Sequence, residues 1–205
     1  MRRNFEILGF SMGWFAVIAQ LILALHNRQT EVGEALLRFF SYFTILTNTL
    51  VVLFFTVRVF GLKRRAWILF HRRPTPMALT AFILVVGLMY QVVLRQIWNP
   101  TGLQQVVDEL LHTVIPIFMY VYWLLFTSKN LVGWKDLQSW LLYPLLYLVW
   151  VLVRGRYSGF YPYPFLDLDT LGSMQTLLNS ALVLVVIILV MAALYFLGRL
   201  LRPKQ

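Results

Sequence analysis

The sequence predicts an all-α membrane protein that crosses the bilayer six times, and three observations support this prediction. The chain has 205 residues, of which 60% are hydrophobic and only 13% are charged, whereas a soluble domain is about half apolar and about a quarter charged. Apolar stretches of about 18 residues or more recur along the whole chain, as spanning helices require. The length leaves room for about six spans with short connections, so we expect a single transmembrane domain over residues 1–205.

The spans can be placed from the apolar stretches and the polar segments that separate them. A short basic lead precedes the first span, and a polar turn with Glu31 and Glu34 follows it. A basic connection, 58–76, the turn Asn-Pro-Thr-Gly at 99–102 and a segment rich in Tyr and Pro, 154–169, mark later boundaries. A short polar connection, 128–138, separates spans four and five. The expected spans are 5–25, 36–57, 77–97, 106–126, 139–153 and 174–197, and a basic tail ends the chain.

The distribution of charge predicts the orientation in the membrane. If the N-terminus is cytoplasmic, thirteen of the eighteen Lys and Arg residues lie on the inner side and five on the outer side, while six of the eight acidic residues lie outside. The positive-inside rule then places both termini in the cytoplasm. The net charge of +10 does not indicate a nucleic-acid partner, because the basic residues lie at the ends of spans.

Several kinds of chemistry are excluded by what the sequence lacks. There are no cysteines, so disulfides and thiolate chemistry are excluded. Three histidines and scattered acids show no metal-ligand spacing, and no glycine-rich phosphate loop is present, so we expect neither a metal nor a cofactor. The first apolar segment is too long for a cleavable signal peptide. The sequence assigns no oligomeric state.

A polar stripe near the start of the second span is the first feature that points to a site. Ser41, Thr44 and Asn48 fall at i, i+3 and i+7 of the expected helix, and Thr47 lies beside them. Polar side chains in hydrocarbon need partners, so we expect this face to turn toward protein or a wet cavity. The plainer interpretation is that such threonines bond their own i−4 carbonyls or hold helices together.

A histidine early in the fourth span is the second such feature. An ionisable residue within a span suggests function, and Asp108 lies four residues before His112, so its carboxylate can reach the imidazole. Pro116 cannot donate to the carbonyl of His112, so we expect a kink there. The plainer interpretation is a histidine at the membrane interface whose hydrogen bonds are satisfied.

Thr44 and His112 lie at similar depths, roughly 9–12 Å from the outer end at about 1.5 Å per residue. Together they contain the parts of a nucleophile–base pair.

Short motifs in this order resemble a known family. Phe43-Thr44 with Thr47-Asn48, Leu111-His112-Thr113 with Pro116, and Tyr161-Pro162-Tyr163-Pro164-Phe165-Leu166-Asp167 resemble the androgen-induced-gene family, and most closely its bacterial six-span relatives. The resemblance extends over nearly the whole chain. It implies an intramembrane hydrolase of lipid esters, such as fatty acid esters of hydroxy fatty acids, with Thr44 as the nucleophile and His112 as the base. It also implies the inner membrane of a bacterium. It does not settle the ester that is cleaved.

The remaining polar residues receive supporting roles in this hypothesis. Asp108 would orient His112, Asn48 would donate to the oxyanion, and Thr47 is the alternative nucleophile. An arginine at the outer side would bind a carboxylate head of a membrane lipid or fatty-acyl ester; the candidates are Arg95, Arg154 and Arg156. Two other classes stay open, a lipid-binding or transport protein without catalysis and a structural subunit of a larger complex. Covalent labelling by a fluorophosphonate would favour the hydrolase, whereas copurification of lipid or of another subunit would favour the others.

Overall fold

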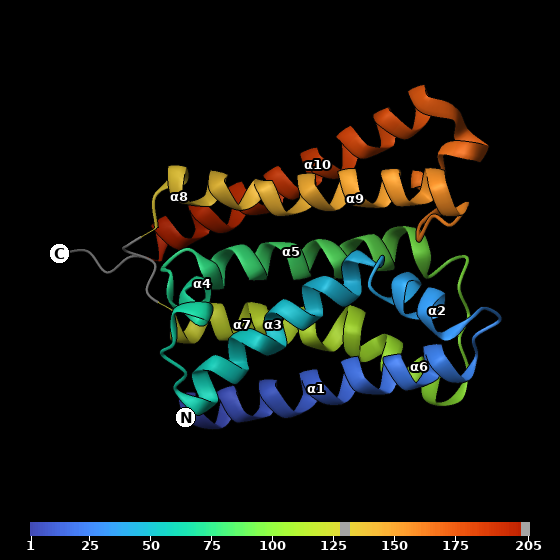
Figure 1. Ribbon diagram of the computed structural model, residues 1–205. Helices are drawn as coiled ribbons and strands as arrows, with labels where there is room; N and C mark the ends of the chain where they lie inside the picture. The colour runs from blue at the N-terminus through green and yellow to red at the C-terminus, as the bar shows by residue number, and fades with distance from the viewer. Residues whose placement is uncertain (128–131, 202–205) are drawn as a thin grey trace.

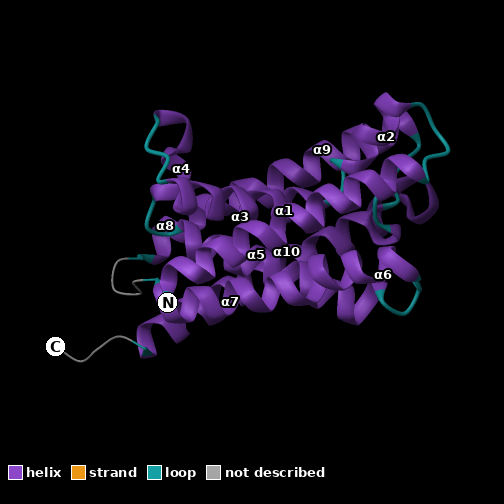
Figure 2. Ribbon diagram, turned by 90° about the horizontal axis from the view of Figure 1, so that it is seen from below, coloured by secondary structure: helices purple, strands orange, loops and turns teal. Residues whose placement is uncertain are grey.

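The structure is a computed structural model that describes residues 1–127 and 132–201, and these residues form an all-α bundle. No strand occurs within the described ranges (Figure 2). Six of the helical segments are long and apolar enough to cross a membrane. The predicted fold class is therefore confirmed, and the chain has the architecture of a multi-pass membrane protein.

The six long segments include three that join shorter pieces. The single helices are α1 (Arg2–His26), α3 (Phe43–Phe60) and α10 (Leu168–Leu200), which bends at Gly172 where φ is +74°. The third segment is α5 (Thr75–Met89) continued by a π-helical turn, Tyr90–Leu94. The fourth joins α6 (Gly102–Glu109), a second π-helical turn (Leu110–Val114) and α7 (Ile115–Phe126). The fifth joins α8 (Trp134–Gln138), a 3₁₀ turn (Ser139–Leu141) and α9 (Leu142–Ser158).

Short helices lie in the connections. They are α2 (Val32–Phe39), α4 (Ile68–His71) and the 3₁₀ turns Arg65–Trp67 and Pro164–Leu166. The expected second span, 36–57, is wrong at its start, because the chain leaves the helix after Phe39 and re-enters it at Phe43. The residues from Leu36 onward are apolar enough to read as one stretch, but those up to Phe39 belong to α2, which buries only Ala35 and Phe39. As a result Thr44 lies in the first turn of α3.

The long helices run side by side between two ends of the molecule (Figure 1). The N-terminus and the end of α10 lie at one end, which we call the terminal end. The other end, which we call the site end, holds α2, the beginning of α3 and α6. The loops between helices gather at these two ends (Figure 2). This arrangement is that of a bundle in which each span reverses the direction of the one before.

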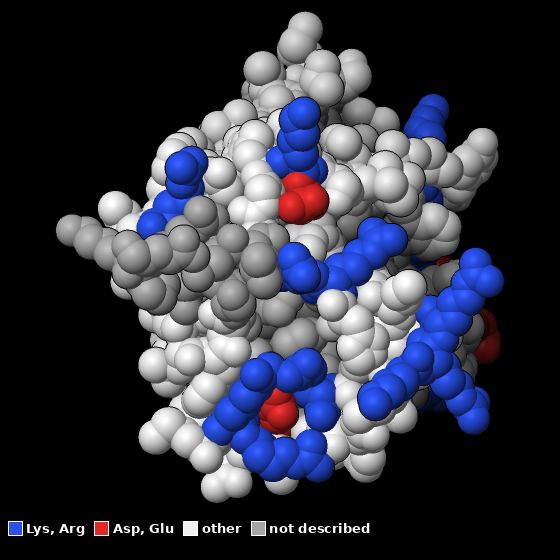
Figure 3. All heavy atoms as spheres, turned by 90° about the vertical axis from the view of Figure 1, so that its left-hand side faces the viewer, with Lys and Arg blue, Asp and Glu red and all other residues white. Residues whose placement is uncertain are grey.

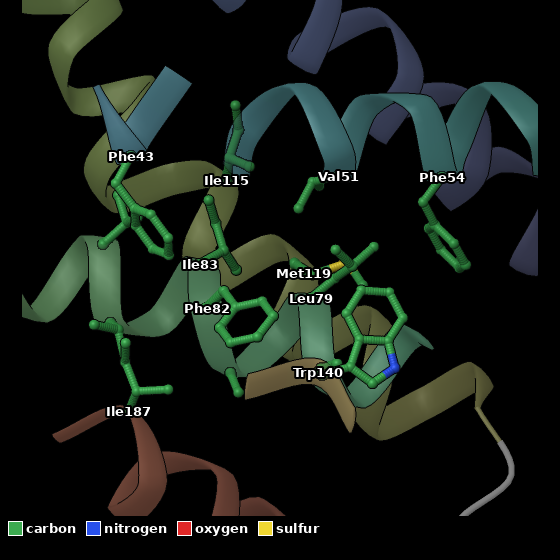
Figure 4. Packing of buried hydrophobic residues seen from close by; sticks show 14 of the residues in the cluster. Phe43, Val51, Phe54, Leu79, Phe82, Ile83, Ile115, Met119, Trp140 and Ile187 are labelled. Carbon is green, nitrogen blue, oxygen red and sulfur yellow. The ribbon is translucent and has the colours of Figure 1, made fainter. Parts of the chain in front are cut away.

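The core lies around α3 and α5, which are the most buried of the six long segments. Aromatic and aliphatic side chains from α3, α5, α7 and α10 interdigitate there (Figure 4), among them Phe82, Met119 and Ile187, each at most 3% exposed. In contrast, α9 and α10 expose many large apolar side chains, such as Leu146, Leu182 and Leu189. An apolar exterior of this extent suits contact with lipid.

Basic side chains spread over the terminal end, with few acidic ones among them (Figure 3). By their positions in the chain, Arg3 in the first turn of α1 and Arg64 and Arg72 in the connection between α3 and α5 lie at this end. Lys129, Arg202 and Lys204, which the sequence also assigns to the inner side, lie outside the described residues. The excess of basic over acidic side chains at this end is the feature from which the orientation is predicted. The orientation itself stays a prediction.

Candidate active site

The structure brings Thr44 and His112 together at the site end. The Thr44 Oγ1 lies 3.3 Å from the Nε2 of His112, within hydrogen-bonding distance. Both residues are buried, with 6% and 9% of their surface exposed. Thr44 is the second residue of α3, so its hydroxyl lies near the positive end of that helix dipole. The predicted similarity in depth is therefore matched by direct contact.

The His112 side chain projects from the π-helical turn Leu110–Val114. In this turn the N–H of Ile115 donates to the carbonyl of Leu110, five residues back. The next bond of this kind would run from the N–H of residue 116 to the carbonyl of Leu111, but Pro116 has no N–H. The Leu111 carbonyl therefore has no main-chain donor from that position. The Asn48 amide supplies one, with its Nδ2 3.3 Å from the Leu111 oxygen. The irregularity expected from Pro116 thus takes the form of a π-helical turn, which is common at functional sites.

Contacts on the far side of the ring orient His112. Its Nδ1 lies 2.9 Å from the main-chain oxygen of Asp108 and 3.3 Å from the Asp108 carboxylate. Both groups accept hydrogen bonds, so the tautomer that satisfies them has the proton on Nδ1, and in that tautomer Nε2 presents a lone pair to Thr44. The ring also stacks on Tyr90, with centroids 4.3 Å apart and planes 17° apart. Tyr90 begins the π-helical turn of the neighbouring segment.

A glycine allows these two segments to approach each other. A Cβ at Gly87 of α5 would lie 2.9 Å from the main-chain oxygen of His112 and 3.3 Å from Cβ of Pro116. Contacts this short would force the backbone apart. Gly87 therefore permits α5 to pack directly against the turn that carries His112.

Tyr163 is a member of the site that the sequence does not assign to it. Its hydroxyl lies 3.4 Å from Thr44 Oγ1, and it accepts a hydrogen bond of 3.3 Å from the main-chain N–H of Thr44. The ring is 8% exposed and stacks on Phe165 at 5.2 Å. Pro162 and Pro164 flank Tyr163 and restrict its backbone. This Pro-Tyr-Pro pattern is the signal that could have marked it as a rigidly held residue.

Two cavities meet at Thr44 and Tyr163. The larger, of ≈ 570 Å³, lies at the site end, is lined by polar as well as apolar side chains, and includes Asp108 and His112 in its wall. The smaller, of ≈ 80 Å³, is lined almost wholly by apolar side chains of α5, α9, α10 and the turn before α10. Thr44, Leu94 and Tyr163 line both cavities. A molecule with one polar and one apolar part could therefore place the junction between them at Thr44.

The structure gives Asn48 a role other than the predicted one. Its two amide hydrogens are engaged by the carbonyls of Thr44, at 2.9 Å, and Leu111. The opposite amide orientation would set its oxygen against these two carbonyls, which repel it. Asn48 Oδ1 has no partner among the described residues, and an acceptor cannot stabilise an oxyanion. Asn48 therefore joins α3 to the π-helical turn, and the geometry does not favour it as an oxyanion donor.

The other hydroxyls of the predicted stripe lie away from the histidine. Ser41 precedes α3, and its Oγ donates to the carbonyl of Leu37 at 2.6 Å. Thr47 Oγ1 lies 3.0 Å from the hydroxyl of Tyr143. Neither residue lines either cavity. The geometry thus favours Thr44 over Thr47 as a nucleophile, and a single helical stripe that includes Ser41 is wrong because the helix begins later.

The three arginines proposed for a carboxylate head do not line either cavity. Arg95 pairs with Glu109, Arg154 donates to Glu34 at 2.7 Å, and Arg156 lies 3.7 Å from Asp169. The arginines in the wall of the larger cavity are Arg28 and Arg38. The sequence cannot distinguish these sets, because all five arginines lie near the ends of helices at the same end of the bundle.

The charged groups around the larger cavity are partly neutralised. Arg38 and Arg154 both bond the carboxylate of Glu34 at 2.8 and 2.7 Å, and the hydrogen bond from Arg38 is the main cause of a lowered pKa for Glu34.

In the connection before α10, burial raises the pKa of Tyr163. The Tyr163 hydroxyl therefore keeps its proton throughout the neutral range and can serve as a donor.

Comparison of the chain with models of protein families, with curated proteins and with solved structures found no match.

Proposed function

We propose that the protein is an intramembrane hydrolase that cleaves lipid esters with Thr44 as the nucleophile and His112 as the general base. The observation that carries the proposal is the buried contact of 3.3 Å between Thr44 Oγ1 and His112 Nε2. A threonine hydroxyl is a weak nucleophile unless an adjacent base accepts its proton. The lone pair on Nε2 faces this hydroxyl because Nδ1 is held by Asp108.

The reaction then has two halves. In the first, Thr44 Oγ attacks the acyl carbon while its proton passes to Nε2, and the imidazolium returns that proton to the departing alkoxide. In the second, water attacks the acyl carbon of the acyl-threonine while His112 accepts its proton; the bond between that carbon and Thr44 Oγ then breaks, Oγ takes the proton back from His112, and the carboxylic acid leaves. Asp108 stabilises the imidazolium through its carboxylate at 3.3 Å from Nδ1 and keeps the ring in the productive tautomer.

The cavities support an ester with two unlike parts. The apolar cavity among α5, α9 and α10 suits the first few carbons of a fatty-acyl chain, because it is small and its lining offers almost no hydrogen-bonding groups. The larger cavity suits the polar part of the substrate, and Arg28 and Arg38 in its wall could bind an anionic group there. Such an ester is consistent with the resemblance to the androgen-induced-gene family, and we propose that the chain is a bacterial six-span relative of that family in the inner membrane.

The test uses purified protein, a panel of lipid esters and three variants. We expect Thr44→Ala and His112→Ala each to lower kcat by about 10³-fold or more, as removal of a nucleophile or its base does in other hydrolases. Thr44→Ser should retain turnover. Thr47→Ala, which alters the neighbouring hydroxyl without touching His112, is the matched control.

The same variants separate the proposal from its alternative. A fluorophosphonate should label the wild-type protein on Thr44 and should not label Thr44→Ala. Full activity in Thr44→Ala would remove this residue from the mechanism. Copurified lipid with neither turnover nor labelling would instead indicate a lipid-binding or transport protein.

A further inference from the structure

We infer that the Tyr163 hydroxyl is the oxyanion donor of the hydrolytic site, an inference that rests on the proposed function and adds a catalytic residue to it. Attack by Thr44 moves the carbonyl electron pair onto oxygen, and this negative charge needs a donor. Asn48 cannot supply one, because its amide hydrogens are engaged by two main-chain carbonyls. Among the described residues, the other side chain within hydrogen-bonding distance of Thr44 Oγ1 is that of Tyr163, whose hydroxyl lies 3.4 Å away.

The hydrogen bonds around Thr44 leave the Tyr163 proton directed at the reacting centre. The main-chain N–H of Thr44 donates to the Tyr163 oxygen, so that oxygen already acts as an acceptor. The Thr44 hydroxyl donates to Nε2 of His112 when the histidine acts as base. The Tyr163 proton is then available to Thr44 Oγ1, or to an oxygen bound close to it.

During attack this proton changes its acceptor without leaving Tyr163. As the bond between Thr44 Oγ and the acyl carbon forms, Oγ loses its negative character and the former carbonyl oxygen gains it. The Tyr163 O–H turns from the first oxygen to the second and donates to the oxyanion. When the alkoxide departs, the electron pair returns to re-form the carbonyl, and the tyrosine is unchanged. The same hydrogen bond serves the attack of water on the acyl-threonine.

The surroundings hold Tyr163 ready for this role. Its ring stacks on Phe165 and meets the Tyr42 ring edge-on at 5.8 Å, and Tyr163 lines both cavities. A donor fixed before the reaction needs no reorganisation as charge develops, which is why such groups are effective.

Tyr163→Phe tests the inference, and Tyr143→Phe is its matched control. Tyr143 also has a buried hydroxyl bonded to a threonine of α3, that of Thr47, three residues along the chain from Thr44, but it lines neither cavity. We expect Tyr163→Phe to lower kcat by about 10²–10³-fold with KM little changed, while Tyr143→Phe keeps nearly full kcat. A trifluoromethyl ketone, which forms a tetrahedral adduct with the nucleophile, should lose affinity in Tyr163→Phe by a similar factor.

The outcomes distinguish this inference from the function on which it rests. Unchanged kcat in Tyr163→Phe, or equal losses in both tyrosine variants, would overturn the oxyanion role while the roles of Thr44 and His112 stand. Absence of ester turnover in the wild-type protein would overturn both. If Tyr163→Phe does not fold, replacement of Tyr163 by 3-fluorotyrosine keeps the shape and makes the donor more acidic; an unaltered kcat in that protein would contradict the inference.

Discussion

The hydrogen bond between Thr44 and His112 is the contact on which the proposed chemistry of this bundle depends. Thr44 and His112 would be ordinary helix residues if each bonded only its own helix, as Thr80 does through the carbonyl of Pro76. Instead each finds its partner on another segment, in a part of the molecule where both are buried. The sequence marks both residues as candidates: His112 because an ionisable group within a span suggests function, and Thr44 through the polar stripe and the family resemblance. It does not identify Tyr163, since a tyrosine in a connection has many ordinary roles.

Replacement of Asn48 by alanine should lower the stability of the folded protein. A role as oxyanion donor alone would not predict this loss. Asn48→Ala removes the donor to the Leu111 carbonyl, and a buried acceptor left without a partner costs about 1–3 kcal/mol. We expect a lower thermal midpoint in detergent, together with reduced turnover because the turn that carries His112 loosens. Thr49→Val is the control: Thr49 Oγ1 is buried with no partner in the described parts of the chain, so this change should cost little. A fall in kcat at unaltered stability in Asn48→Ala would instead restore Asn48 as a catalytic donor.

At the level of helices, two π-helical turns place the ring of Tyr90 on that of His112. The sequence indicates an irregularity in the fourth span through Pro116, but it gives no comparable signal in the third. The start of α3 also escapes prediction, because hydropathy over 36–57 does not register the break at 40–42. That shift places Thr44 in the first turn of α3 and removes Ser41 from the helix. Which helices contact one another depends on packing along their whole length. The periodicity of a single span gives no information about that packing.

The close packing of α5 on the His112 turn leads to a prediction about Gly87. Gly87→Ala would place a Cβ 2.9 Å from the main-chain oxygen of His112. Overpacking of this kind costs about 1–3 kcal/mol, and it should move His112 away from Thr44. We therefore expect a lower thermal midpoint and a disproportionate loss of kcat. Gly33→Ala in α2, where an added Cβ meets nothing within 4 Å, should leave both unchanged. Normal activity in Gly87→Ala would show that the turn tolerates displacement.

Across the whole molecule, the two ends differ in charge and in cavities, and under the proposed function this difference bears on how a substrate reaches the site. The site end contains the larger cavity, which includes Arg28 and Arg38, while the smaller cavity extends among α5, α9 and α10. Basic side chains dominate the opposite end (Figure 3). If that end is cytoplasmic, an amphipathic ester in the outer leaflet could insert its chain among the helices and leave its polar part at the outer surface. The orientation is thus the feature of the whole fold on which access to the site depends.

The orientation can be tested with single cysteines, because the natural chain has none. Asn99→Cys lies in the exposed connection between the third and fourth long segments at the site end, and Lys63→Cys lies in the exposed connection after α3 at the terminal end. The positive-inside rule predicts that a membrane-impermeant maleimide added to spheroplasts labels Asn99→Cys and spares Lys63→Cys. Permeabilised cells should label both, which controls for the accessibility of each thiol. The reverse pattern would place the site end in the cytoplasm, so that the ester would have to reach Thr44 from the inner leaflet.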